Sequence, residues 1–232
     1  MVIGGGMLAN AFSAYDKIDD VVVLAAGVSN SGETRREAFG RELRLAEKTI
    51  TGLGSRLLVY FSTCSIFDPE ALATPYVQHK LNIETIVCEM VENYTVFRLP
   101  QVAGRTSNCT TLTNYLYHNI IKQQRIDIWD RAYRSIIDVD DVVRIVSHAV
   151  DNGMFRNRVV NVASRPSLVT DIVRILEVIT GKEAVCTHRV KGFRYEIDTS
   201  DISQILKELK IDFGPDYLFR VLSKYYGPVQ QK

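Results

Sequence analysis

Val2-Ile3-Gly4-Gly5-Gly6-Met7-Leu8-Ala9 is the stretch that decides the fold of this 232-residue chain. Two apolar residues lead into three glycines, and residues 7–15 then carry apolar side chains at helical spacing. The glycines therefore fit G-x-G-x-x-A between a predicted strand and a predicted helix. Such glycines let a pyrophosphate approach the backbone, and the helix N-terminus attracts its charge. A triple glycine alone is often only a turn, but this position favours nucleotide binding.

Strands and helices alternate after this turn. The continuous apolar run at residues 21–26 predicts a strand that is buried on both faces. Residues 56–61 predict another buried strand, and residues 95–99 predict a further strand that Pro100 ends. Amphipathic segments at 34–50 and about 76–93 predict helices between them. This alternation predicts a parallel sheet with right-handed crossovers, so the expected fold class is α/β, a Rossmann-like doubly wound parallel sheet.

The pattern loosens after Gly104. Residues 1–104 are predicted to form the Rossmann-like cofactor-binding and catalytic core. Residues 105–232 are predicted to form mostly a small C-terminal substrate-binding lobe, with 126–162 contributing to the core sheet. The elements predicted in this half are strands at 126–129 and 159–162 and helices at 112–122, 140–152, 168–180, 200–209 and 219–225.

The bulk composition excludes several classes of function. Hydrophobic residues make up 46% of the chain and charged residues 24%, as in a globular protein with a sizeable core. A net charge of +1 predicts no nucleic-acid binding, and no apolar run approaches the ~18 residues that cross a bilayer. Cys64, Cys88, Cys109 and Cys186 lack metal-ligand spacing, so no metal site is expected. The N-terminus has no signal-peptide features, and a cytoplasmic location is expected.

Tyr76-Val77-Gln78-His79-Lys80 places a phenol and an ammonium four residues apart. On a helix these positions share one face, so Lys80 can lie near Tyr76 and favour its ionised form. Such a tyrosine can exchange a proton with a sugar or alcohol oxygen while a nicotinamide handles the hydride. Most Tyr-x-x-x-Lys strings are ordinary helix surface, so this interpretation depends on the surrounding motifs.

Six segments in order carry a family resemblance: the glycine turn, Val22-Val23-Leu24-Ala25-Ala26-Gly27, Tyr60-Phe61-Ser62-Thr63, Tyr76-x-x-x-Lys80, Arg98-Leu99-Pro100-Gln101-Val102-Ala103-Gly104 and Asp138-Val139-Asp140-Asp141-Val142-Val143. Together they resemble the extended short-chain dehydrogenase/reductase family from Gly4 to about Ser200. That family contains NAD-dependent epimerases, dehydratases and reductases of nucleotide sugars. The resemblance implies an oxidoreductase or isomerase of polysaccharide biosynthesis, with NAD or NADP as cofactor and a nucleotide sugar as substrate.

The resemblance also implies roles for single residues. The family's catalytic hydroxyl, tyrosine and lysine fall on Thr63, Tyr76 and Lys80, and the lysine also holds the nicotinamide ribose. The nicotinamide-side proline falls on Pro100. The full cofactor-binding set implied is Gly4, Gly6, Met7, Leu8, Ala25, Ala26, Ser62, Tyr76, Lys80 and Pro100.

Three further residues match substrate-binding positions. Arg134 and Arg194 match arginines that bind the nucleotide diphosphate, although either is as readily a solvated surface residue. Gln101 replaces the asparagine of the family's Arg-Leu-Pro-Asn-Val-Tyr-Gly, so altered substrate recognition is expected. The family commonly dimerises through helices that match residues 34–50 and 78–93, which implies a homodimer.

Local departures from the family pattern bear on the reaction. Sugar-nucleotide 4,6-dehydratases carry Asp-Glu where this chain has Cys64-Ser65, so 4,6-dehydration is disfavoured. Residues 62–68 and 6–9 are closer to the dTDP-4-dehydrorhamnose reductases, which favours reduction of a keto sugar or epimerisation through a keto intermediate. Residues 38–42 replace the family's Asn-Val-x-Gly-Thr, so an asparagine that helps hold the active-site helix is missing.

Part of the cofactor fold is also missing. A Rossmann half places a ribose-binding carboxylate roughly 20 residues after its glycines, which here falls inside the apolar run 21–26. Only residues 16–20 separate the first helix from that run, where the family has two further strands. We therefore expect a sheet that lacks two strands of its adenosine-binding half, with Val2-Ile3 at its border and backbone groups unpaired.

This loss leaves three possible states of cofactor binding. The cofactor is held mostly by its pyrophosphate and nicotinamide halves, or another chain rebuilds the adenosine site, or binding has been lost. We expect an active enzyme with weakened adenosine recognition. The alternative is a non-catalytic Rossmann-like binding or regulatory subunit.

Overall fold

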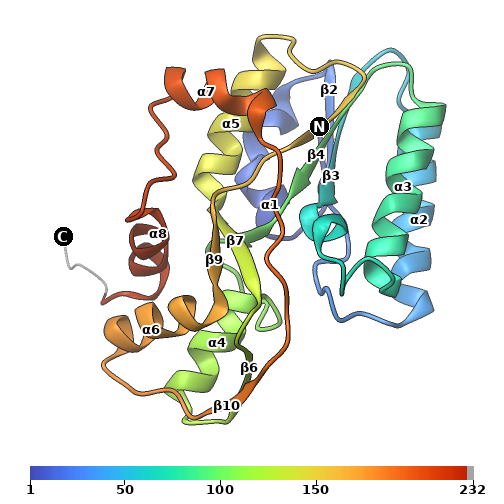
Figure 1. Ribbon diagram of the computed structural model, residues 1–232. Coiled ribbons are helices and arrows are strands. Elements are labelled where there is room, and N and C mark those ends of the chain that lie inside the picture. The colour runs from blue at the N-terminus through green and yellow to red at the C-terminus, as the bar shows by residue number, and fades with distance from the viewer. Residues whose placement is uncertain (229–232) are drawn as a thin grey trace.

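A five-stranded parallel sheet forms the centre of the computed structural model, which describes residues 1–228 (Figure 1). Its strands are β1 (Val2–Ile3), β2 (Val21–Leu24), β3 (Leu57–Thr63), β4 (Tyr94–Leu99) and β8 (Arg158–Asn161). They lie in the order β1-β2-β3-β4-β8, and each neighbouring pair is parallel. The parallel α/β class predicted from the alternating pattern is confirmed.

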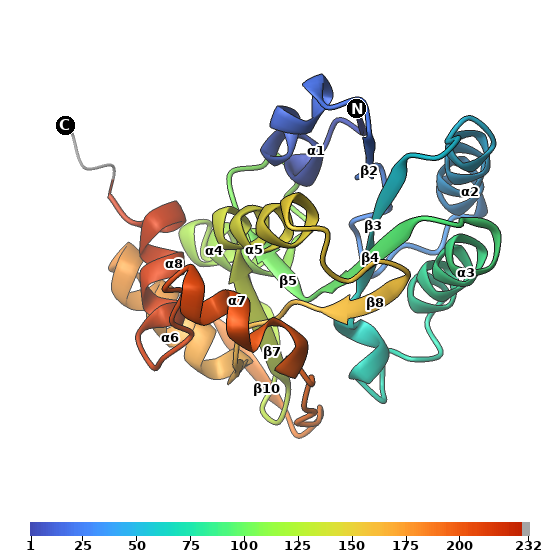
Figure 2. The same ribbon diagram turned by 90° about the horizontal axis from the view of Figure 1, so that it is seen from above.

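Helices cover both faces of this sheet (Figure 2). They are α1 (Met7–Ala11), α2 (Arg36–Thr51), α3 (Pro75–Met90) and α5 (Val139–Asp151). α2 and α3 pack on strand residues such as Val22 and Leu58, whereas α1 and α5 pack on Val23 and Val59. Successive side chains of a strand point to opposite faces. Each continuous apolar run therefore supplies two cores, which makes the sheet doubly wound.

The C-terminal half builds a smaller lobe around its own hydrophobic core. Its elements are β5 (Gln101–Ala103), α4 (Leu112–Ile121), β6 (Ile126–Trp129), β7 (Tyr133–Asp138), β9 (Pro166–Leu168), α6 (Val169–Thr180), β10 (Cys186–Arg189) and α8 (Tyr217–Tyr226). The short helix α7 (Ser203–Glu208) instead packs beside α5 on the core of the central sheet. β5, β7 and β9 form one small sheet, and β6 pairs with β10 in another.

Residues 126–162 were expected to contribute to the core sheet, and of their three strands only β8 does so. β8 pairs with β4, whereas β6 and β7 pair with strands of the lobe. The reason is visible in β6, which buries Ile126 and Ile128 but exposes Asp127 and Trp129. A strand with one buried face suits a small sheet, not the doubly covered centre.

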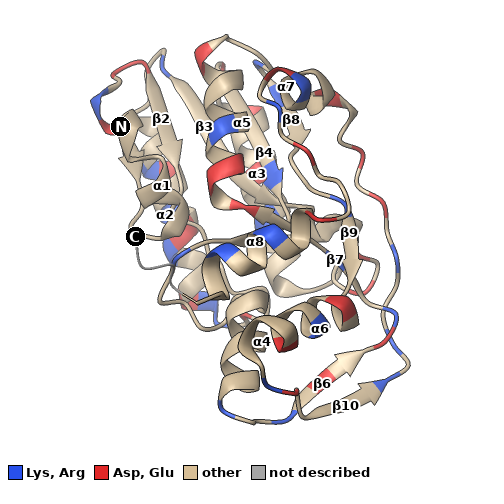
Figure 3. Ribbon diagram, turned by 90° about the vertical axis from the view of Figure 1, so that its left-hand side faces the viewer, with Lys and Arg blue, Asp and Glu red and all other residues tan. Residues whose placement is uncertain are grey.

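Acidic and basic residues are interspersed along the ribbon in Figure 3. Asp127 on β6 and Arg189 on the neighbouring β10 lie 3.9 Å apart at the lobe surface. Among the helices within residues 1–228, none is long and apolar enough to cross a membrane.

β1 borders the sheet, as the shortened sequence predicts. On its inner side, the Ile3 carbonyl accepts a hydrogen bond from the Ala25 N–H at 2.8 Å. The Val2 N–H donates to Asp16 Oδ1, also at 2.8 Å. The expectation of unpaired backbone groups is therefore wrong for the Val2 N–H, because the Asp16 side chain takes the place of a strand partner. An edge closed in this way is a poorer template for a second chain.

We expect Asp16→Ala to lower the free energy of unfolding by about 1 kcal/mol, the net worth of one hydrogen bond, and to increase self-association. Chemical denaturation and sedimentation velocity measure the two effects. Asp19→Ala is the matched control, because Asp19 is a nearby exposed aspartate. Identical behaviour of the two variants would contradict the capping role of Asp16.

Candidate active site

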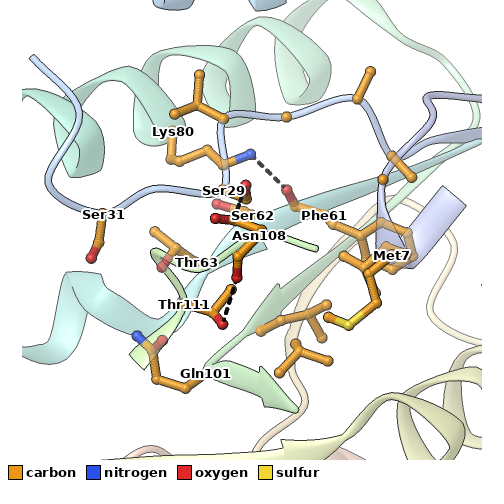
Figure 4. Close-up of a pocket in the computed structure, with 18 of the residues that line it drawn as sticks. Met7, Ser29, Ser31, Phe61, Ser62, Thr63, Lys80, Gln101, Asn108 and Thr111 are labelled. Atoms are coloured by element: carbon orange, nitrogen blue, oxygen red, sulfur yellow. Dashed lines mark hydrogen bonds between the residues drawn. The ribbon is translucent and has the colours of Figure 1, made fainter. Parts of the chain in front are cut away.

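A cavity of about 340 Å³ lies at the carboxyl ends of β2, β3 and β4 (Figure 4). Ligands of open α/β sheets bind at this edge, because loops from several strands converge there. The wall consists of residues 5–8, 24–29, 61–63 and 99–102, with Tyr76 and Lys80 from α3 and residues of the 104–111 loop.

The cavity brings together most of the residues singled out in the sequence. Thr63, Tyr76, Lys80 and Gln101 line it. The predicted cofactor residues at its wall are Gly6, Met7, Leu8, Ala25, Ala26, Ser62, Tyr76, Lys80 and Pro100. Gly4, Arg134 and Arg194 lie outside the wall. Most of the motifs that are separate in the sequence therefore meet at one cavity.

The glycines of the turn differ in what they allow. A Cβ on Gly4 would lie 2.5 Å from the Ala25 carbonyl oxygen, and its φ of +142° favours glycine. Only a glycine at position 4 lets the turn pass this close to the end of β2. A Cβ on Gly5 or Gly6 would meet nothing within 4 Å, so these residues leave room beside the backbone. The following helix ends at Ala11 and continues as a 3-10 turn over Ser13–Lys17, shorter than predicted.

β3 ends at the cavity with two hydroxyl side chains. Thr63 Oγ1 accepts a hydrogen bond from the Ser65 N–H at 3.0 Å and starts the helical turn Cys64–Phe67. Ser62 Oγ is buried and has no hydrogen-bond partner among the described residues. A buried hydroxyl without a partner costs about 1–3 kcal/mol. Because Ser62 also lines the cavity, its hydroxyl is available to a polar group of a ligand.

Lys80 reaches the cavity with all three N–H donors already engaged by the protein. Its Nζ lies 2.9 Å from Glu42 Oε1, 3.2 Å from the Tyr60 hydroxyl and 3.1 Å from the Phe61 carbonyl oxygen. The last of these bonds is drawn in Figure 4. An ammonium has three donors and no acceptor. Lys80 is therefore fixed in place by α2 and β3 before any ligand binds.

Glu42, on α2, is the centre of this buried cluster. Its Oε2 accepts from the Val28 N–H at 2.7 Å and lies 3.0 Å from His79 Nε2. Burial opposes its charge, but the His79 hydrogen bond and the Lys80 charge outweigh burial and lower the pKa of Glu42 to about 2. Burial likewise opposes the charge of Lys80, whereas Tyr60 and Glu42 raise the pKa of Lys80. Both groups of the pair are charged at neutral pH.

Glu42 is not among the site residues predicted from the sequence, in which residues 38–42 stand out only as a departure from the family pattern. A signal was present in the helical spacing. The buried residues of α2 are Ala38, Glu42, Ala46 and Thr49. A carboxylate in the buried stripe of an amphipathic helix requires a buried partner, and Lys80 is the partner found.

The two arginines predicted to bind the diphosphate lie away from the cavity wall. The Arg134 guanidinium is 3.2 Å from Asp68 Oδ2 and donates to the Tyr133 carbonyl at 2.7 Å. Arg194 pairs with Glu196 at 2.9 Å and lies over the Tyr133 ring at 5.5 Å. Their substrate-binding role stays a prediction.

Two loops meet at one side of the cavity through side-chain hydrogen bonds. Asn108 Nδ2 donates to Ser29 Oγ at 3.0 Å, which joins the loop after β5 to the loop after β2. Asn114 Nδ2 donates to the Asn108 carbonyl at 2.8 Å, and the Tyr226 hydroxyl donates to Asn114 Oδ1 at 2.6 Å. The C-terminal helix α8 thus supports the loop that closes the cavity.

The sheet is doubly wound, and a glycine turn, a threonine at the end of a strand and a Tyr-x-x-x-Lys pair on a helix line one cavity. These features define a short-chain dehydrogenase/reductase fold. Residues 6–163 match the model of the NAD dependent epimerase/dehydratase family, and the chain belongs to this family. No curated protein matches the sequence.

Solved structures confirm the fold at low sequence identity. UDP-glucuronic acid 4-epimerase from Bacillus cereus, in complex with UDP-glucuronic acid and NAD, has a TM-score of 0.71 and 18% identity, covering 94% of this chain and 77% of its own. UDP-glucose 4-epimerase from Thermus thermophilus, in complex with NAD, has a TM-score of 0.67 and 14% identity, and the match covers 94% of this chain and 81% of that structure. dTDP-glucose 4,6-dehydratase from Bacillus anthracis, in complex with NAD, has a TM-score of 0.66 and 14% identity, and the match covers 94% of this chain and 76% of that structure.

Gly27 lets the chain after β2 pass beside the buried pair. A Cβ there would lie 2.4 Å from Lys80 Nζ and 2.8 Å from Glu42 Oε1. We expect Gly27→Ala to lower the free energy of unfolding by about 1–3 kcal/mol, as overpacked sites do. Gly5→Ala, with open space at its Cβ, is the control and is expected to change stability by less than about 0.5 kcal/mol. Equal stability of both variants in urea denaturation would show that the pair does not need this close approach.

Proposed function

We propose that this chain binds NAD or NADP in the cavity and transforms a nucleotide-activated sugar. The reaction is epimerisation through a keto intermediate or reduction of a keto group, in a cytoplasmic homodimer that packs through α2 and α3. The observation that carries the proposal is the meeting of Thr63, Tyr76 and Lys80 with the glycine turn and Pro100 in one cavity.

The cavity suits the nicotinamide and pyrophosphate parts of a dinucleotide better than its adenosine part. Gly5 and Gly6 leave space for a pyrophosphate, and Ser62 Oγ offers a buried polar partner. Among the described residues of the wall, Lys80 alone carries a charge. The wall therefore provides neither a carboxylate for the adenosine ribose nor an arginine for a 2′-phosphate, the groups that distinguish NAD from NADP.

A bound nicotinamide would supply the hydride chemistry. The chain's own residues act at the reacting sugar oxygen, where Tyr76 exchanges the proton and Thr63 donates or accepts a hydrogen bond. Arg134 supports binding of the diphosphate. A guanidinium has five N–H donors, and the contacts to Asp68 and the Tyr133 carbonyl leave further donors for phosphate oxygens.

Water elimination is disfavoured by the residue that follows Thr63. Cys64 is buried, and its thiol lies 3.2 Å from the Arg98 carbonyl oxygen. Burial raises the pKa of Cys64 to about 12, so the thiol keeps its proton at neutral pH and cannot act as a base. The described cavity wall holds no carboxyl group that could take over this role.

If the adenosine half of the cofactor is not recognised, the chain is expected to discriminate poorly between NADH and NADPH. In calorimetric titrations we expect NADH and NADPH to bind with Kd values within about threefold of each other, less than about 1 kcal/mol apart. Reduced nicotinamide mononucleotide is expected to bind within about tenfold of NADH, because the adenosine half adds little. Failure of NADH and NADPH to bind below millimolar concentration would remove the cofactor from the proposal.

Turnover distinguishes the two reactions. With NADH or NADPH and a 4-keto sugar nucleotide, a reductase consumes cofactor absorbance at 340 nm. An epimerase instead interconverts UDP- or dTDP-hexoses, detected by NMR, without net consumption of cofactor. We expect Tyr76→Phe to lower kcat by about 10²–10⁴-fold with the fold intact, whereas Tyr115→Phe, at an exposed tyrosine of α4, leaves it unchanged.

One observation favours the second candidate, a non-catalytic binding or regulatory subunit. The donors of Lys80 are all engaged by the protein, as in a residue kept for stability. Under this alternative no nucleotide sugar is turned over by the wild-type chain, and Tyr76→Phe retains whatever partner binding the wild type has.

A further inference from the structure

We propose that Asn108 and Ser29 form a latch across the rim of the cavity, and that Tyr226 on α8 is the positioning residue that holds this latch closed. The closed latch limits the access of a ligand to the cavity. The inference deepens the proposed function, on which it rests for the identity of that ligand. Tyr226 lies outside the cavity wall and acts through Asn114.

The latch joins the central sheet to the lobe. Ser29 follows β2 and Asn108 follows β5, and both residues line the cavity. Asn108 Nδ2 donates to Ser29 Oγ at 3.0 Å (Figure 4). Ser29 is exposed and Asn108 is half-buried, so this bond lies where the cavity meets solvent. A single hydrogen bond at such a place contributes little net stability, because water can replace each partner. The latch can therefore open while the rest of the fold stays intact.

Asn108 is held in place by its own loop and by α4. Its Oδ1 accepts from the Thr110 N–H at 2.9 Å, and its N–H donates to Thr106 Oγ1 at 3.1 Å. Its carbonyl oxygen accepts from Asn114 Nδ2, in the first turn of α4, at 2.8 Å. The position of Asn108 at the rim therefore depends on the side-chain amide of Asn114.

Tyr226 fixes the orientation of that amide. Asn114 is buried, and its Oδ1 lies 2.6 Å from the Tyr226 hydroxyl. An amide oxygen only accepts, so the phenol donates its one proton here, and the Thr113 hydroxyl, 2.8 Å away, donates to the phenol oxygen. This arrangement turns Asn114 Nδ2 toward the Asn108 carbonyl. Without the phenol, the buried amide oxygen loses its donor, which favours other positions of the amide and releases the loop.

The helix α8 stays in place without the Tyr226 hydroxyl. The Tyr225 hydroxyl donates to Asp138 Oδ1 at 2.6 Å, and Lys224 Nζ donates to Asp138 Oδ2 at 2.6 Å. The Tyr226 ring packs on the Tyr117 ring with centroids 4.8 Å apart, and a phenylalanine retains this contact. Tyr226→Phe therefore removes the support of the latch and leaves the helix docked.

Amide hydrogen exchange in the free chain reports the state of the latch. We expect Tyr226→Phe to speed exchange of the Thr110 N–H, measured by magnetisation-transfer NMR, by about tenfold, because its acceptor Asn108 is no longer held. Tyr225→Phe, the same change one position earlier on α8, is the matched control and leaves this rate in place. Ser29→Ala removes the acceptor of the latch from an exposed loop and is expected to speed the same exchange.

A thiol probe measures access to the cavity. Ser62 lines the cavity with a buried hydroxyl that has no partner among the described residues, so Ser62→Cys places a small thiol there. Its alkylation by iodoacetamide, followed by mass spectrometry, is expected to speed up by about tenfold when Tyr226→Phe or Ser29→Ala is added. Adding Tyr225→Phe is expected to have no effect. The same variants with Ser62 intact give the background from the buried Cys64.

An unchanged Thr110 exchange rate in Tyr226→Phe overturns the inference. Equal acceleration by Tyr225→Phe also overturns it, because docking of α8 would then be the cause. Thiol reactivity that is the same in all variants overturns the latch as a limit on access. Combining Tyr226→Phe with Ser29→Ala is expected to be no faster than either change alone, and multiplied rates would contradict a shared latch. Both readouts use the chain alone, so failure of NADH to bind counts against the proposed function and leaves them unaffected.

Discussion

The buried contact between the Glu42 carboxylate and the Lys80 ammonium is the interaction on which the site depends. It joins α2 to α3, and through Tyr60 and Val28 it ties both helices to β3 and to the loop after β2. Of these elements, α3, β3 and the loop after β2 form one side of the cavity, and α2 supports them from behind. A buried pair compensates its desolvation only with good geometry and further hydrogen bonds, and loss of one partner costs about 3–5 kcal/mol. Here Gly27 provides the necessary space, so the pair and the cavity wall form one unit.

The shortened sheet is the second constraint. With two strands absent, β1 becomes the edge and the support for adenosine is missing, yet the glycine turn still lies at the cavity wall. Asp16 closes the edge at Val2, so the sheet ends in a side-chain contact and not in an open ladder. Because the glycine turn, Thr63 and Tyr76 still line one cavity, we infer an enzyme with weak adenosine recognition.

The fold and most of the cavity could be predicted because they depend on local patterns. Runs such as residues 57–61 are apolar throughout, and the carboxyl ends of parallel strands meet, which brings Ala25, Ser62 and Pro100 to one edge of the sheet. β5, β7, β9 and β10 were missed. β5 and β9 have only three residues each and are defined by their pairing with β7, not by their own periodicity. Glu42 was missed for a related reason, since its meaning depends on Lys80, 38 positions away.

We infer that the cavity binds the cofactor through its nicotinamide and pyrophosphate parts. An amide NMR titration of the ¹⁵N-labelled chain with NADH measures this binding residue by residue. The claim predicts saturable shift changes at the amides of Gly5, Gly6 and Ser62, with no change at Asp16 beside the β1 edge. Unchanged glycine-turn and Ser62 amides up to millimolar NADH would contradict the claim.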